Sequence, residues 1–471
     1  MISVHRTLPD CRSDMCRKRI KQFNGSLPEF SVVLVFNNEA WTTLLRSVHS
    51  LINRTPQHLL KEILLVDDNS DFDHLRGPLH RHFRLFPKVK IIHSPQRIGL
   101  IRARLLGFDS TVAPVVIFLD SHVECFPGWA ESMLIRITRN PQAVVFPIIE
   151  SISDRNFGVQ CTARIEEYCT FLWKTLQYHW VPIPRRELNR RMDDDDSYRS
   201  PVMPGGIFAV TREFFTKLGK YDPKLGFWGG ENMELSFKTW MCGGTLEMDP
   251  CSYVGHVFRL GGSIKVDASV IFRNAVRVAE VWMDDYKNYF YEMNNYRNIN
   301  PGNVTDRVLL RQSLQCKSFA WYLKNLFPEQ TFPHSMNYAG EIRSRAFAKC
   351  IDSNIQNHEA SIRPILIGCS GFGRNQVWYM GVSGHIFQED LHVHFICVTG
   401  VSVLHSAKEC QPPGPHWEYR KDNSLYHVPT GKCLTADGVT DNLSMTPCTN
   451  SSLQKWHFQE RRTDLGFPRY T

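Results

Sequence analysis

The chain has 471 residues, of which 42% are hydrophobic and 22% are charged. This composition is too apolar for a disordered protein, and the length is sufficient for roughly two to four domains with cores of ordinary size. The formal net charge of +8 comes from basic residues scattered along the chain. Such a pattern favours anionic small molecules over nucleic acid as ligands.

The cysteine content indicates the compartment. The 14 cysteines are many for a reducing environment, so we expect an oxidising lumen. The apolar runs fall far short of the roughly 18 residues of a membrane span, and residues 1–10 lack the apolar segment of a signal peptide. The chain would therefore reach the lumen through a targeting segment that this sequence does not show.

The first third of the chain alternates short apolar runs with helical patterns, which is typical of a largely parallel sheet covered by helices. The predicted strands are Phe30–Phe36, Glu62–Val66, Val89–His93 and Val115–Leu119. Apolar residues recur at helical spacing between the first two strands, and Ile98–Phe108 is a second predicted helix. Ligands of such sheets bind beyond the carboxyl ends of the strands, where Asp67, Asp68 and Asp120 are found.

The last third of the chain has a different character. Pro and polar residues at Pro328–Asn337 predict a linker, after which the sequence repeats itself weakly three times. Each repeat of roughly 40 residues contains two cysteines and then a tryptophan, namely Cys350, Cys369 and Trp378, then Cys397, Cys410 and Trp417, then Cys433, Cys448 and Trp456. This period predicts an all-β module of three lobes, with the tryptophans in a shared core rather than at ligand sites.

Two short motifs contain side chains suited to a divalent cation. Asp120 and His122 directly follow a predicted buried strand, and His256 lies in a second motif that ends at Arg259. A carboxylate and imidazoles that share one cation would neutralise a diphosphate. Taken alone, each motif is more typical of a structural role, because Asp and His at a strand end usually hydrogen-bond the next turn.

A third motif, Trp228-Gly229-Gly230-Glu231-Asn232, has Gly205-Gly206 upstream. Glycines let the backbone approach a ligand, while the other side chains offer a stacking face, an acceptor and an amide, as in sugar sites. The alternative is an ordinary turn before a helix. The sequence lacks the motifs of P-loop NTPases, zincins and serine hydrolases. We expect the acidic run Asp193–Asp196 to be a solvated loop rather than a cation site.

The motifs belong to an ordered series. The series is Leu8-Pro9-Asp10, Phe36-Asn37-Asn38-Glu39-Ala40-Trp41, Val66-Asp67-Asp68, Gly99-Leu100-Ile101-Arg102-Ala103-Arg104, Leu119-Asp120-Ser121-His122, Trp228-Gly229-Gly230-Glu231-Asn232, Val254-Gly255-His256-Val257-Phe258-Arg259 and Ala279-Glu280-Val281-Trp282-Met283-Asp284. In this order the motifs resemble the polypeptide N-acetylgalactosaminyltransferases, followed by the ricin-type lectin domain of that family. The resemblance covers nearly the whole chain.

The resemblance implies an α/β catalytic domain with the Rossmann-like GT-A fold of nucleotide-diphospho-sugar transferases, followed by an all-β ricin-type β-trefoil. We place the catalytic domain at 1–327, a linker at 328–340, the lectin domain at 341–460 and a C-terminal tail at 461–471. The implied activity is the retaining transfer of GalNAc from UDP-GalNAc to Ser or Thr hydroxyls of proteins with Mn2+, which initiates mucin-type O-glycosylation. The lectin domain would bind GalNAc-bearing glycopeptides.

The resemblance also implies a location. Members of the family are usually type II Golgi proteins, so the expected location is the Golgi lumen. The N-terminal anchor is absent from this chain, and we expect an incomplete N-terminus, with an unanchored form as the alternative.

The resemblance assigns site residues by motif position. The metal ligands would be Asp120, His122 and His256. The donor contacts would be Val35, Asn37, Asp68, Arg97, Ser121, Gly206 and Trp228, the catalytic residues Glu231, Asn232 and Arg259, and the acceptor residue Phe258. In the lectin domain Asp352 and Asn375 would bind sugar in the first lobe. Thr399 and Thr435 take the aspartate position in the other lobes, so we expect at most one working site.

Disulfides are implied in the same way. The implied pairs are Cys16 with Cys251, Cys242 with Cys316, Cys350 with Cys369, Cys397 with Cys410, and Cys433 with Cys448. Cys11, Cys125, Cys161 and Cys169 are left without a partner.

The expected chemistry is stabilisation of charge on the departing UDP, which a cation and an Arg achieve without proton transfer. Retention ordinarily indicates a carboxylate nucleophile, but the sequence identifies none. We therefore favour front-face attack, in which the leaving phosphate takes the acceptor proton. Glu231 as the nucleophile is the alternative.

Four departures from the family pattern keep other functions open. The stretch Leu260–Lys265 lacks the His, Tyr and Pro-Gly residues of the family's lid, which excludes water and contacts the diphosphate. Asn37 stands where His is common, Ile98 replaces a Glu, and Leu225–Phe227 stand where an acidic residue is usual.

The intact metal triad favours an active transferase. The alternatives are an inactive pseudo-glycosyltransferase that binds UDP, metal or GalNAc, and an unrelated metal-dependent hydrolase.

Overall fold

The structure is a computed structural model, and it describes residues 2–161, 165–258, 266–294, 299–328, 336–354, 361–369, 374–381, 384–389, 393–399, 403–407, 416–437 and 440–458. The chain divides into two compact units. The first unit contains Met1–Phe171, Thr175–Lys287 and Asn298–Pro328, and the second contains Leu172–Lys174, Asn288–Arg297 and Glu329–Thr471. Within the described ranges, none of the helices combines the length and the apolarity that crossing a membrane requires.

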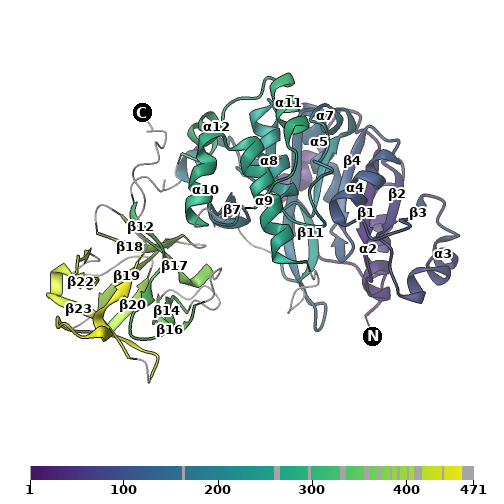
Figure 1. Cartoon of the computed structure of the whole chain (residues 1–471). Coiled ribbons are helices and arrows are strands. Elements are labelled where there is room, and N and C mark those ends of the chain that lie inside the picture. Colours follow the sequence, from purple (N-terminus) through teal and green to yellow (C-terminus); the bar gives the residue numbers. More distant parts are fainter. Residues whose placement is uncertain are drawn as a thin grey trace. The chain divides into compact units, whose positions relative to one another are not determined.

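A mixed sheet forms the centre of the first unit (Figure 1). Its strand order is β3-β2-β1-β4-β10-β6-β11-β5, and β9 pairs with β11. Its strands are β1 (Phe30–Phe36), β2 (Leu60–Asp67), β3 (Val89–His93), β4 (Val115–Asp120), β5 (Val123–Cys125), β6 (Ala143–Ser153), β9 (Tyr198–Arg199), β10 (Phe208–Thr211) and β11 (Thr245–Phe258). The first four strands of this order are parallel, whereas β10 runs antiparallel to both neighbours. The predicted parallel strands are confirmed, and the second half of the sheet is mixed.

Helices cover this sheet (Figure 1). They are α1 (Asp14–Gln22), α2 (Trp41–Arg54), α3 (Gly77–Phe83), α4 (Leu100–Asp109), α5 (Trp129–Arg139), α6 (Arg185–Arg190), α7 (Arg212–Lys217), α8 (Glu231–Met241), α9 (Ala268–Trp282), α11 (Thr305–Ser313) and α12 (Phe319–Leu326), with α10 (Lys287–Met293) at the unit boundary. Every residue of β1 is buried, as expected for a parallel strand covered on both faces. Helix α2 buries Leu44, Val48 and Leu51 against the sheet, and this spacing forms one apolar stripe.

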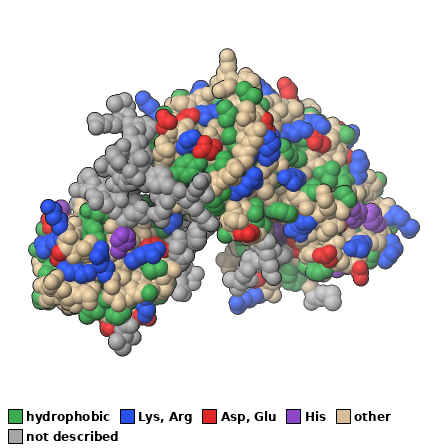
Figure 2. Space-filling model, in the orientation of Figure 1, with side chains coloured by type: hydrophobic (Ala, Val, Ile, Leu, Met, Phe, Trp, Pro, Cys, Tyr) green, Lys and Arg blue, Asp and Glu red, His purple; other side chains and the backbone are tan. Residues whose placement is uncertain are grey.

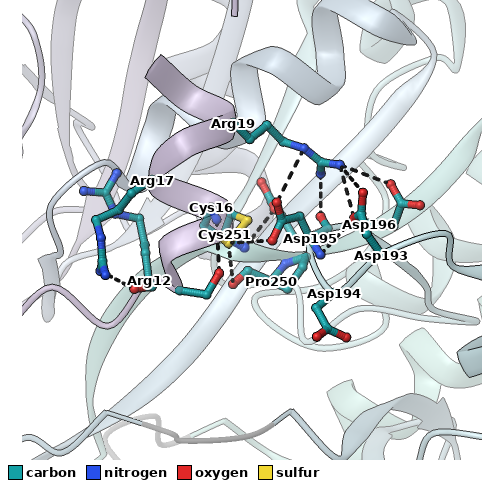
Figure 3. Close-up of a disulfide and its surroundings, with 12 residues drawn as sticks. Arg12, Cys16, Arg17, Arg19, Asp193, Asp194, Asp195, Asp196, Pro250 and Cys251 are labelled. Carbon is teal, nitrogen blue, oxygen red and sulfur yellow. Dashed lines mark hydrogen bonds and ion pairs between the residues drawn. A yellow bond between two sulfur atoms is a disulfide. The ribbon is translucent and has the colours of Figure 1, made fainter. Parts of the chain in front are cut away.

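Three disulfides lie in the first unit. The structure contains two of the expected pairs, Cys16–Cys251 (Figure 3) and Cys242–Cys316. It also joins Cys11 to Cys161 across 150 residues, which corrects the expectation that these two cysteines lack a partner. Cys125 and Cys169 are buried free thiols, and burial raises the pKa of each.

The acidic run Asp193–Asp196 lies beside the Cys16–Cys251 disulfide (Figure 3). Asp193 and Asp194 are exposed, as expected, but the expectation of a solvated loop is wrong for Asp195, which is 2% exposed. Arg19 on α1 explains the difference, since its guanidinium donates to the carbonyl of Asp195 at 2.7 Å and lies within ion-pair distance of the neighbouring carboxylates. The cation compensates for burying part of this acidic loop.

The second unit is built from short strands in three sheets, with orders β12-β17-β18-β19-β20-β15, β16-β14-β13-β25 and β21-β22-β23-β24. The strands are β12 (Met336–Glu341), β13 (Arg343–Ser344), β14 (Lys349–Asp352), β15 (Ser361–Ile362), β16 (Ile365–Gly368), β17 (Val377–Gly381), β18 (Ile386–Glu389), β19 (Val393–Thr399), β20 (Val403–Ala407), β21 (Trp417–Tyr419), β22 (Leu425–His427), β23 (Lys432–Ala436), β24 (Leu443–Pro447) and β25 (Trp456–His457). Strand β12 takes up the last residues of the segment expected to be a linker. Residues 461–471 lie outside the described residues.

The three repeats share one core, as predicted. Trp378, Trp417 and Trp456 are at most 1% exposed and belong to the same cluster. Each indole N–H donates to a backbone carbonyl, at distances of 2.9, 3.1 and 3.0 Å, which satisfies the buried polar atom. The expected disulfides Cys350–Cys369 and Cys433–Cys448 are present. Cys397 is disulfide-bonded, and Cys410 lies outside the described residues.

Candidate active site

The sheet brings Asp120, His122 and His256 together at one edge. Asp120 ends β4, His122 lies in the turn before β5, and His256 lies on β11, which pairs with β5. One ligand atom from each residue lies within 4.8 Å of the other two. His256 Nε2 is 3.4 Å from Asp120 Oδ2, and the two imidazole rings meet edge to face with centroids 4.6 Å apart. Residues separated widely in sequence therefore form one group of potential metal ligands.

Arg104 on α4 holds the carboxylate of this group. Its guanidinium is 1% exposed and donates to Asp120 Oδ1 at 3.1 Å and to the carbonyls of Gly205 and Gly206 at 2.8 and 3.2 Å. Burial opposes ionisation of Asp120, but the hydrogen bond from His256 and the charge of Arg104 together lower its pKa to about 2. Arg104 was not predicted to be a site residue, although an arginine within a predicted apolar helix was an available signal.

Glu39 is a second residue of the site that was not predicted from the sequence. Its Oε2 lies 3.0 Å from Nδ1 of His122 and accepts a hydrogen bond from the Ser121 hydroxyl at 2.9 Å. Glu39 itself is 3% exposed. A carboxylate behind an imidazole fixes the ring's orientation and tautomer, as is usual for histidines that bind metals. The available signal was the position of Glu39 in the motif after β1.

Asp68, which is buried at the end of β2, organises the region expected to bind the nucleotide. Its carboxylate accepts the backbone N–H groups of Ile98 and Gly99 at 2.7 and 3.0 Å, and the Arg97 guanidinium lies 3.3 Å away. The bond to residue 98 comes from its backbone N–H. It therefore forms with Ile98 as it would with the Glu that is usual in the family. The Asn37 amide donates to the Asp68 carbonyl at 2.8 Å.

Val35 and Gly206 bring backbone close to Asp120. Val35 is the register partner of Asp120 in the parallel pair of β1 and β4. A Cβ atom at Gly206 would lie 2.3 Å from Asp120 Oδ2, so only glycine fits beside this carboxylate.

Glu231 and Asn232 begin α8 on the side expected to frame the sugar, after the half-buried Trp228. Glu231 is 4% exposed, and its Oε2 has no hydrogen-bond partner among the described residues. Burial raises the pKa of this carboxyl group, and the negative charge of Asp120 adds to the effect. The Asn232 amide donates to the Met203 carbonyl at 3.2 Å. Glu231 therefore offers a buried acceptor atom that a ligand hydroxyl would satisfy.

Two expected elements lie at the limit of the described chain. Phe258 is the last residue of β11 and is 51% exposed, with its ring 4.3 Å from that of His256. Arg259 lies outside the described residues, as does Leu260–Lys265, the segment whose sequence differs from the family's lid. Their roles stay predictions.

In the second unit, Asp352 and Asn375 lie close together. The Asp352 carboxylate accepts the Gln376 amide at 3.1 Å and the Asn354 N–H at 2.8 Å, and the Asn375 carbonyl accepts the Ser353 N–H at 2.8 Å. In the third lobe the Thr435 hydroxyl bonds Thr446 at 2.6 Å and the Gln454 amide at 3.0 Å. The side chain of Thr399 lies outside the described residues.

Comparison with known proteins agrees with this architecture. The model of glycosyl transferase family 2 matches residues 31–218, that of the N-terminal domain of galactosyltransferase matches 188–260, and that of the ricin-type β-trefoil lectin domain matches 338–456. The fold and site thus define a glycosyltransferase of the GT-A class with a C-terminal ricin-type β-trefoil.

Relatives that match nearly the whole of this chain identify the family within this class. Polypeptide N-acetylgalactosaminyltransferase 5 of Caenorhabditis elegans is 43% identical over 98% of this chain and 74% of its own length, and the human enzyme 13 is 38% identical over 97% and 82%. A crystal structure of GalNAc-T7 with UDP, GalNAc and Mn2+ superposes with a TM-score of 0.77 at 33% identity, covering 98% of this chain and 87% of that one. The chain belongs to the polypeptide N-acetylgalactosaminyltransferases.

Proposed function

We propose that the chain transfers GalNAc from UDP-GalNAc to Ser or Thr hydroxyls of proteins, and so initiates mucin-type O-glycosylation, with Asp120, His122 and His256 holding Mn2+. The convergence of these three side chains is the observation that carries the proposal. One ionised carboxylate and two imidazoles form a donor set that suits a divalent transition metal. When bound, the cation would neutralise the diphosphate of the donor.

The surrounding residues have defined parts in this proposal. Arg104 keeps Asp120 ionised and fixed, and Glu39 orients His122. Asp68 and Arg97 would bind the uridine diphosphate together with Val35 and Asn37. Gly206, Ser121, Trp228, Glu231 and Asn232 would frame the sugar, with Arg259 on the diphosphate and Phe258 toward the acceptor.

The environment of Glu231 bears on the mechanism. A nucleophilic carboxylate must be ionised, but burial raises the pKa of Glu231 and therefore disfavours its anion. We propose that the acceptor hydroxyl attacks on the face that UDP leaves, while the leaving phosphate takes the hydroxyl proton. Glu231 would then bind a sugar hydroxyl and form no covalent bond.

The remaining parts of the proposal concern location and the lectin domain. We place the catalytic domain at 1–327, the linker at 328–340 and the lectin domain at 341–460, with Asp352 and Asn375 binding GalNAc on glycopeptides. The disulfides support an oxidising compartment, and we propose the Golgi lumen.

One experiment tests the activity. The purified chain is incubated with UDP-GalNAc, Mn2+ and a panel of Ser/Thr-rich peptides, and mass spectrometry detects an added N-acetylhexosamine. We expect modified peptides from the wild type and none from His256→Ala, while the exposed His457→Ala serves as the control. Thermal stabilisation by UDP and Mn2+ without modified peptide would indicate a pseudo-glycosyltransferase. Release of UDP without peptide product would indicate a hydrolase.

A further inference from the structure

Asn274 on α9 inserts its side chain into the turn that precedes Glu231. The side chain is 0% exposed. Its Oδ1 accepts the N–H of Gly226 at 2.8 Å, and its Nδ2 lies within hydrogen-bonding distance of the carbonyls of Gly226, Trp228 and Gly229, at 3.0, 3.1 and 2.8 Å. One amide group therefore binds four backbone groups of the turn 226–229.

The shape of this turn decides where the sugar-facing side chains lie. Gly229 and Gly230 have φ angles of 91° and 86°, a left-handed backbone that needs external support to be the only conformation populated. Trp228 lies within the turn, and Glu231 follows it as the first residue of α8. A change in the turn would move both residues.

The opposite side of the turn contacts the nucleotide region. The N–H of Leu100 donates to the Phe227 carbonyl at 2.8 Å, and a Cβ at Gly99 would lie 2.5 Å from Phe227 Cα. Gly99 also donates its N–H to Asp68. The turn is thus packed between α9 and the first residues of α4, and Asn274 is its support on the α9 side.

We propose that Asn274 is a positioning residue that fixes the sugar-binding turn, and that it thereby sets how much more tightly the site binds UDP-GalNAc than UDP. The inference rests on the proposed function. It predicts a selective effect, because the Asn274 side chain bonds only the turn 226–229 among the described residues, whereas the contacts of Asp68 with Arg97, Ile98 and Gly99 do not involve Asn274.

Titration calorimetry in Mn2+ with the full chain tests this role. In Asn274→Ala we expect the affinity for UDP-GalNAc to fall about tenfold or more, because buried carbonyls lose their donor, while the affinity for UDP changes little. Asn274→Asp, which puts a carboxylate against three carbonyl oxygens, should lose more than Asn274→Ala. Thr55→Val removes the buried bond from Trp129 Nε1, 3.0 Å long, and should lower thermal stability without changing the ratio of the two affinities.

A second route reaches the same turn without touching Asn274. A Cβ at Gly226 would lie 2.6 Å from Val270 Cγ1 of α9, so Gly226→Ala should reproduce the selective loss and Val270→Ala should restore part of it. Failure of the wild type to bind UDP-GalNAc would overturn the proposed function and this inference together. An unchanged ratio in the Asn274 and Gly226 variants of a chain that binds UDP-GalNAc would overturn this inference alone.

Discussion

Glu39 Oε2 lies 3.0 Å from Nδ1 of His122, so a buried carboxylate supports one of the three potential metal ligands from behind. We predict that Glu39→Gln lowers the affinity for Mn2+ by about 10- to 100-fold, as is usual when such a partner is lost. Electron paramagnetic resonance of free Mn2+ measures the affinity. Glu29→Gln, which removes a half-exposed carboxylate paired with Lys61, is the control. Equal affinities in the two variants would contradict the role of Glu39.

The Arg104 guanidinium, which is 1% exposed, forms an ion pair with the 22% exposed side chain of Asp120 and also donates to two backbone carbonyls. We predict that Arg104→Met lowers the free energy of unfolding by about 1 to 3 kcal/mol, because it leaves the half-buried Asp120 carboxylate and two backbone carbonyls without their donor. The double variant Arg104→Met/Asp120→Asn should lose less than the sum of the two single variants. Urea unfolding of the three variants measures these changes, and simple additivity would show that the two side chains do not interact.

Local patterns predicted the four parallel strands of the first unit, and the fully buried strand β1 appears as a continuous apolar run. The bounds of β1 and β3 equal the predicted ones. Contacts between distant segments leave no such pattern, so the pairing of Cys11 with Cys161 was not predicted.

The difference between local patterns and contacts of distant segments also explains which site residues were predicted. Asp120, His122 and His256 stand in recognisable motifs, whereas the roles of Arg104 and Asn274 depend on backbone groups about 100 and 50 residues away in sequence. Charge patterning also failed at Asp195, because the compensating Arg19 lies in α1 and no local rule relates the two segments.

The disulfide between Cys16 and Cys251 attaches α1 to β11 across 235 residues. We predict that Cys16→Ser/Cys251→Ser destabilises the first unit by about 4 to 5 kcal/mol, because a long loop is released in the unfolded chain. Cys433→Ser/Cys448→Ser, with a separation of 15 residues, should cost the second unit about 3 kcal/mol. Urea unfolding under oxidising conditions compares the two variants with the wild type. An equal or smaller loss for the longer loop would show that native contacts, such as those of Arg19, compensate for the bond.

From the buried imidazole of His49 on α2 we predict that the free energy of unfolding falls in acid. His49 is 2% exposed. Its Nε2 lies 2.9 Å from Nε2 of His82, and its ring centroid lies 4.4 Å from the ring centroid of His5. Burial and the nearby charges of His5 and His82 lower the pKa of His49 from 6.5 to about 4. Between these values the unfolded chain binds a proton that the folded chain does not, so the free energy of unfolding falls as the pH falls from 6.5 towards 4.

We expect this contribution to be on the order of 1 kcal/mol after solvent screening, and to be fully present above pH 6.5. Burial also lowers the pKa of His82, so its effect has the same sign. Urea unfolding at a series of pH values measures the dependence, which should become shallower in His49→Leu and stay unchanged in the exposed His457→Asn. Parallel profiles for the wild type and His49→Leu would place the acid sensitivity in other groups, since the unfolded state of the variant has no imidazole to protonate at this position.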